Sequence, residues 1–258
     1  MTGRLRRWIP AIGVFLTFIA VWEGLVRVFD IRNFILPAPS GILGAFPGAW
    51  PEVWPASIGT FLSALGGLTL GTVLGILAAA GAARWPMVRE GAMPLAITAN
   101  STPIIVLAPV ANAWFGLLSP WSTIVVVAVL VFFPIMINMV RGLLSTSASE
   151  LELMASYAAT RKTMLWKLQL PGALPYMFSA LKVAAALSLI GAIVKEYFGG
   201  SQQRLGQYLT LKAGNFQFEE VWTAILLASA FGIGLYLLIT LIERRYMGWH
   251  VSVRAAKV

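Results

Sequence analysis

The sequence contains no cysteine and only one histidine, His250, among its 258 residues. The missing cysteines exclude disulfides and thiolate metal sites, and they leave the redox compartment of the protein unspecified. A metal centre needs several ligands, and His250 has no metal-ligand residue beside it, so no metal site is expected. No cluster of His, Asp or Cys has the spacing of a catalytic site, which argues against an enzyme.

Charged residues are also scarce. They make up 11% of the sequence, against about a quarter in a soluble domain, while hydrophobic residues make up 59%. The mean hydropathy is +0.81. A soluble chain of this composition would expose large apolar patches and aggregate. The sequence therefore predicts a protein whose solvent is lipid.

The net charge of +9 does not indicate nucleic-acid binding. Basic residues stand in small groups between apolar segments and are not gathered on a polar domain. This distribution is typical of residues that anchor a chain beside anionic lipid headgroups and of short cytoplasmic loops. We therefore expect the basic residues to contact membrane lipids and not nucleic acid.

The predicted fold class is all-α, a polytopic membrane protein with about six transmembrane helices, since each crossing needs about 20 apolar residues. The expected spans are approximately residues 8–29, 56–83, 91–117, 121–140, 173–194 and 221–242. The first span is too long for a cleaved signal peptide, so we expect it to be retained. A connector rich in Pro and Gly, residues 33–54, follows it, with a short helix that begins after Pro39. The whole chain, residues 1–258, is predicted to form one transmembrane domain.

Lysine and arginine counts predict that both termini are cytoplasmic. With the N-terminus inside, thirteen of the 19 basic residues lie on the inner side and five on the outer side. The remaining one, Lys182, lies inside the fifth span and is the only mid-span charge without an obvious partner. Glu23 in the first span has Arg27 four residues later, which predicts a structural ion pair across one helix turn.

The third span combines prolines with polar side chains. Pro94, Pro103 and Pro109 interrupt it, and broken polar helix at membrane depth is tolerated where it packs in protein or lines a wet cavity. The candidate pathway residues are Asn100, Ser101, Thr102, Asn112, Asn138 and Glu196. Two alternatives stay open: hydrogen bonding between helices for the polar residues, and an interfacial pair with Lys195 for Glu196.

The polar loop between the fourth and fifth spans, about residues 150–172, predicts two short amphipathic helices on the cytoplasmic side. An apolar face with i, i+3, i+4, i+7 spacing is formed by Leu151, Met154, Ala155 and Ala158. Thr160 can cap a second helix that ends before Pro171. Such a pair forms a knob for another protein's groove, or an interfacial hairpin with no partner. Arg161, Lys162 and Lys167 then either meet acidic groups of that protein or solvate the loop.

This loop resembles the EAA loop of bacterial ABC-importer permeases, in which Glu-Ala-Ala is followed by a glycine, a hydrophobic residue and Leu-Pro. The matching positions are Glu152, Leu153, Met154, Ala158, Leu168, Leu170 and Pro171. Leu153 and Met154 replace the alanines of the family. Ala158 stands where the family has glycine, and because alanine disfavours a positive φ, we expect this turn to close differently.

Other segments are similar to permeases of the nitrate/sulfonate/taurine type. They are Leu36 to Pro39, Pro103 to Gly116, Val194 to Gly200, Arg204 to Gly206 and Glu243 to Trp249. The resemblance implies a permease in the inner (plasma) membrane that pairs with a second permease copy, most simply as a homodimer. It also implies two ABC ATPase subunits and a periplasmic or lipid-anchored solute-binding protein as partners.

The sequence has no Gly-x-x-x-x-Gly-Lys-Ser/Thr phosphate loop, so no cofactor is expected on this chain, and ATP and Mg belong on a separate ATPase. We therefore expect the protein to be the transmembrane permease subunit of an ATP-driven importer. A second polar loop, at about residues 195–220, is expected on the outer side of the membrane. The alternative is an ATP-independent secondary transporter or channel, for which we find no internal repeat. The resemblance points to small anionic or heterocyclic solutes, such as sulfonates, taurine, nitrate or pyrimidine-like vitamin precursors, without choosing among them.

Overall fold

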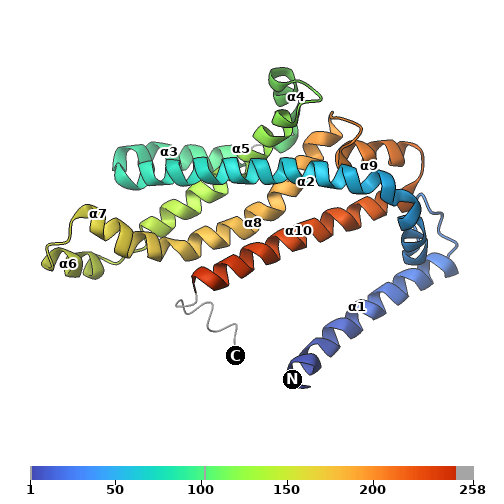
Figure 1. Cartoon of the computed structure of the whole chain (residues 1–258), viewed down its shortest axis with the longest axis horizontal. Helices are drawn as coiled ribbons and strands as arrows, with labels where there is room; N and C mark the ends of the chain where they lie inside the picture. The colour runs from blue at the N-terminus through green and yellow to red at the C-terminus, as the bar shows by residue number, and fades with distance from the viewer. Residues whose placement is uncertain (1, 102, 248–258) are drawn as a thin grey trace.

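The computed structural model describes residues 2–101 and 103–247, and within these residues the chain is all-helical (Figure 1). Thr102, His250 and the end of the closing motif beyond Met247 lie outside the described residues. In the part of the chain that the structure describes, five helices are long and apolar enough to cross a membrane. They are Ile9–Val28 within α1 (Thr2–Val28), α2 (Pro39–Arg84), α5 (Pro120–Leu143), the continuous stretch Arg161–Tyr197, and α10 (Phe218–Tyr246).

Helix α1 lies at the edge of the bundle and joins it through polar contacts near its end (Figure 1). The carboxylate of Glu23 accepts hydrogen bonds from the N–H of Ser40 at 3.0 Å and from its hydroxyl at 2.7 Å. Arg27 Nε lies 2.6 Å from the same carboxylate, which confirms the predicted ion pair. Because Ser40 begins the first turn of α2, Glu23 places a negative charge at the positive end of that helix.

Helix α2 is longer than the sequence predicts. It begins at Pro39, as expected, but it continues for 46 residues to Arg84, so most of the expected connector is helical. Pro47, Pro51 and Pro55 lie inside it with four-residue spacing, on one side of the helix. Each proline removes one backbone hydrogen bond, and the helix turns sharply in this region (Figure 1).

The core is built where α2 crosses α5 and where α5 packs against α8 (Leu170–Tyr197). Val127, Val131 and Ile135 of α5 are fully buried there. Gly71 of α2 lies so close to α5 that an added Cβ would stand 2.5 Å from the carbonyl oxygen of Ala128. Gly67, Gly71 and Gly75 are spaced four residues apart, so they form a small-residue face on α2 that permits this close approach.

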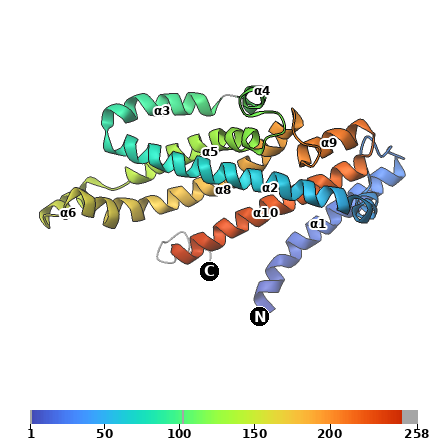
Figure 2. The same ribbon diagram turned by 45° about the horizontal axis from the view of Figure 1, so that its top comes forward.

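The expected third span is divided. Helix α3 (Pro86–Asn100) and helix α4 (Ile104–Phe115) replace the single helix predicted for residues 91–117. Pro103 has extended backbone and forms the N-cap of α4, so a new helix begins after it. Figure 2 shows α3 running back along α2, with α4 directed across it.

Four short elements connect the long helices at the two ends of the bundle. Helix α6 (Ala148–Ser156), helix α7 (Arg161–Met164) and the π turn η1 (Leu165–Gln169) follow α5 and lead into α8. Helix α9 (Leu205–Gly214) lies within the polar loop predicted at residues 195–220. Figures 1 and 2 place α6 and α9 at opposite ends of the molecule.

Candidate functional site

Helix α6 projects beyond the bundle at one end (Figure 1) and is fixed at its start by a capping box. The hydroxyl of Ser147 accepts a hydrogen bond from the N–H of Glu150 at 3.3 Å, and the Glu150 carboxylate accepts from the N–H of Ser147 at 2.8 Å. The bond from the Ser147 N–H, and after it a second bond of 2.9 Å that the Ser147 hydroxyl donates to the same carboxylate, hold the pKa of Glu150 below its ordinary value. The sequence analysis missed this pair, although Ser-x-x-Glu is its signal.

The end of α6 is closed by Ala158 in the left-handed conformation, with φ of +54°. The N–H of Ala159 donates to the carbonyl of Met154 at 3.0 Å, and the N–H of Ala158 donates to that of Ala155 at 2.9 Å. This is the hydrogen-bond pattern of a Schellman turn, in which glycine is the favoured residue. The expectation that alanine closes this turn differently is therefore wrong: Ala158 adopts the glycine conformation and bears its steric cost.

Helix α7 is capped by Thr160, whose side chain accepts a hydrogen bond from the N–H of Thr163 at 3.2 Å, as the sequence predicts. The predicted end before Pro171 is wrong. The N–H of Leu170 reaches the carbonyl of Leu165, five residues back, and helix α8 continues through Pro171. The wider π turn makes room for the proline ring, and Pro171 has no N–H to leave unpaired.

The predicted loop residues fall into two groups. Glu152, Leu153, Met154 and Ala158 lie in α6 and its closing turn, whereas Leu168, Leu170 and Pro171 lie in η1 and the first turn of α8. None of these seven side chains is buried.

Two aromatic side chains that the sequence analysis did not select stand beside them: Tyr157 is 77% exposed and Trp166 is 64% exposed. Large apolar side chains exposed on a projecting loop are typical of a surface that another protein covers. Their signal in the sequence is the presence of aromatic residues in an otherwise polar loop.

At the opposite end of the bundle, buried polar groups join α2 to the end of α8. Thr60 and Glu196 are 0% and 1% exposed, and the Thr60 hydroxyl donates to the Glu196 carboxylate at 2.7 Å. The N–H of Gly206 donates to the same carboxylate oxygen at 3.3 Å, and the N–H of Leu205 donates to the Thr60 hydroxyl at 2.9 Å. We call Thr60, Glu196, Leu205 and Gly206 the α2–α8 latch.

Two cations flank the latch. Arg204 donates hydrogen bonds to the carbonyl of Gly59 and, at 2.9 Å, to the hydroxyl of Ser63, both on α2. Lys195 is 1% exposed and donates to the carbonyl of Gly199 at 3.1 Å. Glu196 thus faces protein on all sides, and its contacts differ from those of an exposed interfacial pair.

The other candidate pathway residues are dispersed. Asn100 and Ser101 are exposed at the end of α3, where the Ser101 hydroxyl donates to the carbonyl of Ile97 at 3.3 Å. Asn112 of α4 donates to the carbonyl of Phe198 at 3.4 Å, and Asn138 of α5 donates to Pro134 of its own helix at 2.8 Å. Among these described residues, the contact of Asn112 is the one that links two helical segments.

Ion pairs tie α10 to the rest of the bundle. Lys182, which the sequence analysis left without a partner, lies 2.5 Å from Glu243 near the end of α10. Near its start, Glu220 accepts from Lys212 of α9 at 2.8 Å, and Lys212 also lies 3.0 Å from Glu52 of α2. Burial alone would lower the pKa of Lys212, but the hydrogen bonds and charges of the two carboxylates outweigh it and raise that pKa.

Comparison with known proteins gives a consistent result. A family model described as "Binding-protein-dependent transport system inner membrane component" matches residues 71–248. A formylaminopyrimidine transport permease protein of Halalkalibacterium halodurans is 30% identical over 91% of this chain and 93% of its own length. A riboflavin transport system permease protein of Chloroflexus aurantiacus is 28% identical over 94% of this chain and 92% of its own. A taurine transport system permease protein of Escherichia coli is 23% identical over 95% of this chain and 90% of its own length.

Proposed function

The chain belongs to the binding-protein-dependent transport system inner membrane components, of the nitrate/sulfonate/taurine type, and we propose that α6 is the part on which a separate ATPase acts. It is a multi-pass plasma-membrane permease of an ABC importer. This assignment decides against the ATP-independent transporter or channel.

The observation that carries the proposal is the continuity of helix from the exposed loop to the latch. Residues Arg161–Tyr197 form one helical stretch of 37 residues, about 55 Å long at 1.5 Å per residue. Caps at Ser147 and Thr160 and the turn at Ala158 hold α6 and α7 rigidly. A displacement of α6 by a partner is therefore passed along α8 to Glu196 at its other end.

We propose that α6 faces the cytoplasm and that both termini do so. The excess of Lys and Arg on that side supports this orientation. Helices α3 and α4 together then make the return crossing between α2 and α5, because α3 alone, at about 22 Å, is shorter than the hydrocarbon core. In Figures 1 and 2, α1 begins and α10 ends on the side of the molecule away from α9.

The proposed assembly contains two permease copies, two ATPase subunits carrying ATP and Mg, and one solute-binding protein. The exposed Leu153, Tyr157 and Trp166 supply apolar anchors for the ATPase, and Glu152, Arg161 and Lys162 supply charged contacts around them. Asn100 and Ser101 at the end of α3 and Asn112 of α4 are proposed to line the solute path, and Thr102, which lies outside the described residues, is proposed to join them.

The solute is proposed to be small and polar. Permeases named for formylaminopyrimidine and riboflavin support a heterocycle, and those named for aliphatic sulfonates and taurine support an organic anion. The ligand that co-purifies with the cognate solute-binding protein distinguishes these two classes. A ligand of neither class would remove this part of the proposal.

The coupling role is tested by Glu152→Lys in the assembled transporter. We expect ATPase activity that no longer responds to the loaded binding protein, because the reversed charge disrupts docking of α6. Glu90→Lys is the matched control, since Glu90 is also exposed but lies on α3. Assembly and coupling unchanged by Glu152→Lys would remove α6 from the mechanism.

A further inference from the structure

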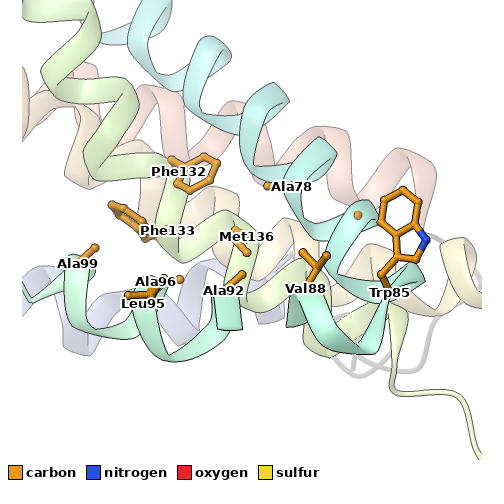
Figure 3. A pocket seen from close by; sticks show the side chains of 11 residues that line it. Ala78, Trp85, Val88, Ala92, Leu95, Ala96, Ala99, Phe132, Phe133 and Met136 are labelled. Atoms are coloured by element: carbon orange, nitrogen blue, oxygen red, sulfur yellow. The ribbon is translucent and has the colours of Figure 1, made fainter. Parts of the chain in front are cut away.

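An apolar groove of about 550 Å³ lies between α2, α3 and α5 (Figure 3). Its floor on α2 is made of small residues, Ala78 and Gly81, and its wall on α5 carries Phe132 and Met136. The long axis follows α3 from Trp85 at one end to Ala99 at the other (Figure 3). The groove is thus apolar and elongated along α3, which suits an extended hydrocarbon chain.

The third side of the groove is one face of α3. Trp85, Val88, Ala92 and Ala99 line it with spacings of three, four and seven residues, which places them on the same side of the helix. The stretch from Trp85 to Ala99 is about 21 Å long at 1.5 Å per residue, whereas one leaflet of hydrocarbon is about 15 Å deep. The groove is therefore long enough for the tail of a lipid that enters from one leaflet.

One end of the groove is cationic. Arg84 ends α2 and is exposed, and Arg89 lies in the first turns of α3 at the edge of the groove face. Among residues 2–101 and 103–247, neither arginine forms an ion pair. Glu90, the neighbouring acid, lies about 180° around α3 from the centre of the groove face. The groove therefore has positive charge at one end, and the rest of its lining is apolar.

We propose that this groove binds one acyl chain of an anionic phospholipid, with the phosphate headgroup held by Arg84 and Arg89. A ligand with one anionic end and an apolar body matches a groove with cations at one end only. Trp85 lies between the two parts, at the level where an indole ring meets headgroups and tails. The proposal goes beyond the transport function and does not depend on which leaflet supplies the lipid.

The tail contacts alone give little selectivity, because lipid tails elsewhere are as apolar as the groove. Discrimination therefore rests on the headgroup, and each arginine near the surface contributes about a fivefold preference for an anionic lipid. A second copy of this chain is the competing occupant. The absence of cysteine allows that alternative to be tested directly with one introduced thiol.

The experiment is native mass spectrometry of the purified full chain with phosphatidylglycerol or phosphatidylcholine of the same acyl chains. We expect retained phosphatidylglycerol, a clear preference over phosphatidylcholine, and a loss of about fivefold per arginine in Arg84→Gln/Arg89→Gln. Arg161→Gln/Lys162→Gln removes the same charge from the exposed α6–α7 loop and should keep the preference. Equal binding of the two lipids, or equal losses in the two double variants, would overturn the proposal.

Two variants of Ala92 test the groove itself. Ala92→Phe fills the channel and should reduce phosphatidylglycerol retention while both arginines remain. Ala92→Cys provides the sole cysteine of the chain, and we expect no disulfide-linked dimer on oxidation in membranes. Efficient cross-linking through that cysteine would identify a second copy as the occupant, and unchanged retention in Ala92→Phe would place the lipid elsewhere. Size-exclusion profiles matching the parent protein establish that each variant is folded.

Discussion

The hydroxyl of Thr60 donates a 2.7 Å hydrogen bond to the carboxylate of Glu196, although the two residues are 136 positions apart in the sequence. The bond joins the middle of α2 to the last turn of α8, and both side chains are excluded from solvent. Helix α6, with its exposed aromatic neighbours, is connected to the other end of the same α8 stretch. The latch therefore fixes the far end of α8, whose other end is connected to α6, the helix on which the proposed partner acts.

Replacing Thr60 with valine keeps the shape of the side chain and removes its hydroxyl. We expect a loss of about 3 kcal/mol, because the Glu196 carboxylate loses a donor and the N–H of Leu205 loses its acceptor in a buried site. The measurement is denaturant or thermal unfolding of the purified protein in one detergent.

Thr72→Val is the matched control on the same helix. The Thr72 hydroxyl is buried without a hydrogen-bond partner among the described residues, so its removal should leave stability unchanged or raise it. Equal changes in the free energy of unfolding for Thr60→Val and Thr72→Val would show that the hydrogen bonds of Thr60 do not stabilise the protein.

Ala158→Gly should stabilise the turn after α6 by about 1 kcal/mol. Ala158 has φ of +54°, where an L residue with a Cβ is strained and glycine is not. Slower hydrogen exchange of the α6 amides is the expected observation.

Ala155→Gly should have the opposite effect and make the α6 amides exchange faster. Residue 155 lies within α6, and glycine costs about 1 kcal/mol in a helix interior. If both glycine variants exchange faster than the parent, Ala158 is not strained in the protein.

Gly206→Ala should destabilise the protein by about 1–3 kcal/mol, although alanine is the better helix former. An added Cβ would lie 2.5 Å from the Cβ of Glu196 and 2.6 Å from the carbonyl oxygen of Ile193, so the latch would have to open. Gly214→Ala, in the same helix and with nothing within 4 Å of the new atom, should be neutral or stabilising. Thermal unfolding compares the two, and a neutral Gly206→Ala would contradict the close approach of α9 to α8.

The capping box at Ser147 predicts a pH dependence of α6. The folded-state pKa of Glu150 is lowered below its ordinary value of 4.5, so its contribution is present above pH 4.5 and is lost as the pH falls through the lowered pKa. Hydrogen exchange of α6, corrected for the intrinsic rate at each pH, should show lost protection in acid. Glu150→Gln retains a capping acceptor and should remove this dependence, and a dependence that persists in Glu150→Gln would assign it to another group.

Several features follow from the sequence because they depend on composition or on neighbouring residues. The long apolar segments determine that the protein resides in a membrane, since no other solvent accepts them. The Glu23–Arg27 pair and the Thr160 cap involve groups three or four positions apart, and both are present. The glycine spacing of α2 identifies a face for close packing without identifying its partner.

Prolines were the main source of error in the predicted elements. Pro47, Pro51 and Pro55 bend α2 without ending it, and Pro171 continues α8 through a π turn, whereas Pro103 does divide the third span. In each case the proline lacks the N–H that would donate the backbone hydrogen bond of its position. Whether the helix bends, widens or ends depends on the packing around it, which the local sequence does not contain.

The sequence alone determined the membrane environment, the approximate helical segments and the family resemblance of the loop around Glu152. Tertiary structure decided which distant groups meet: Lys182 with Glu243, Thr60 with Glu196, and the faces of α2, α3 and α5 that enclose the groove. These contacts join residues tens to more than a hundred positions apart. A buried polar group is satisfied by whichever partner the packing of whole helices brings to it, and no local pattern records that partner.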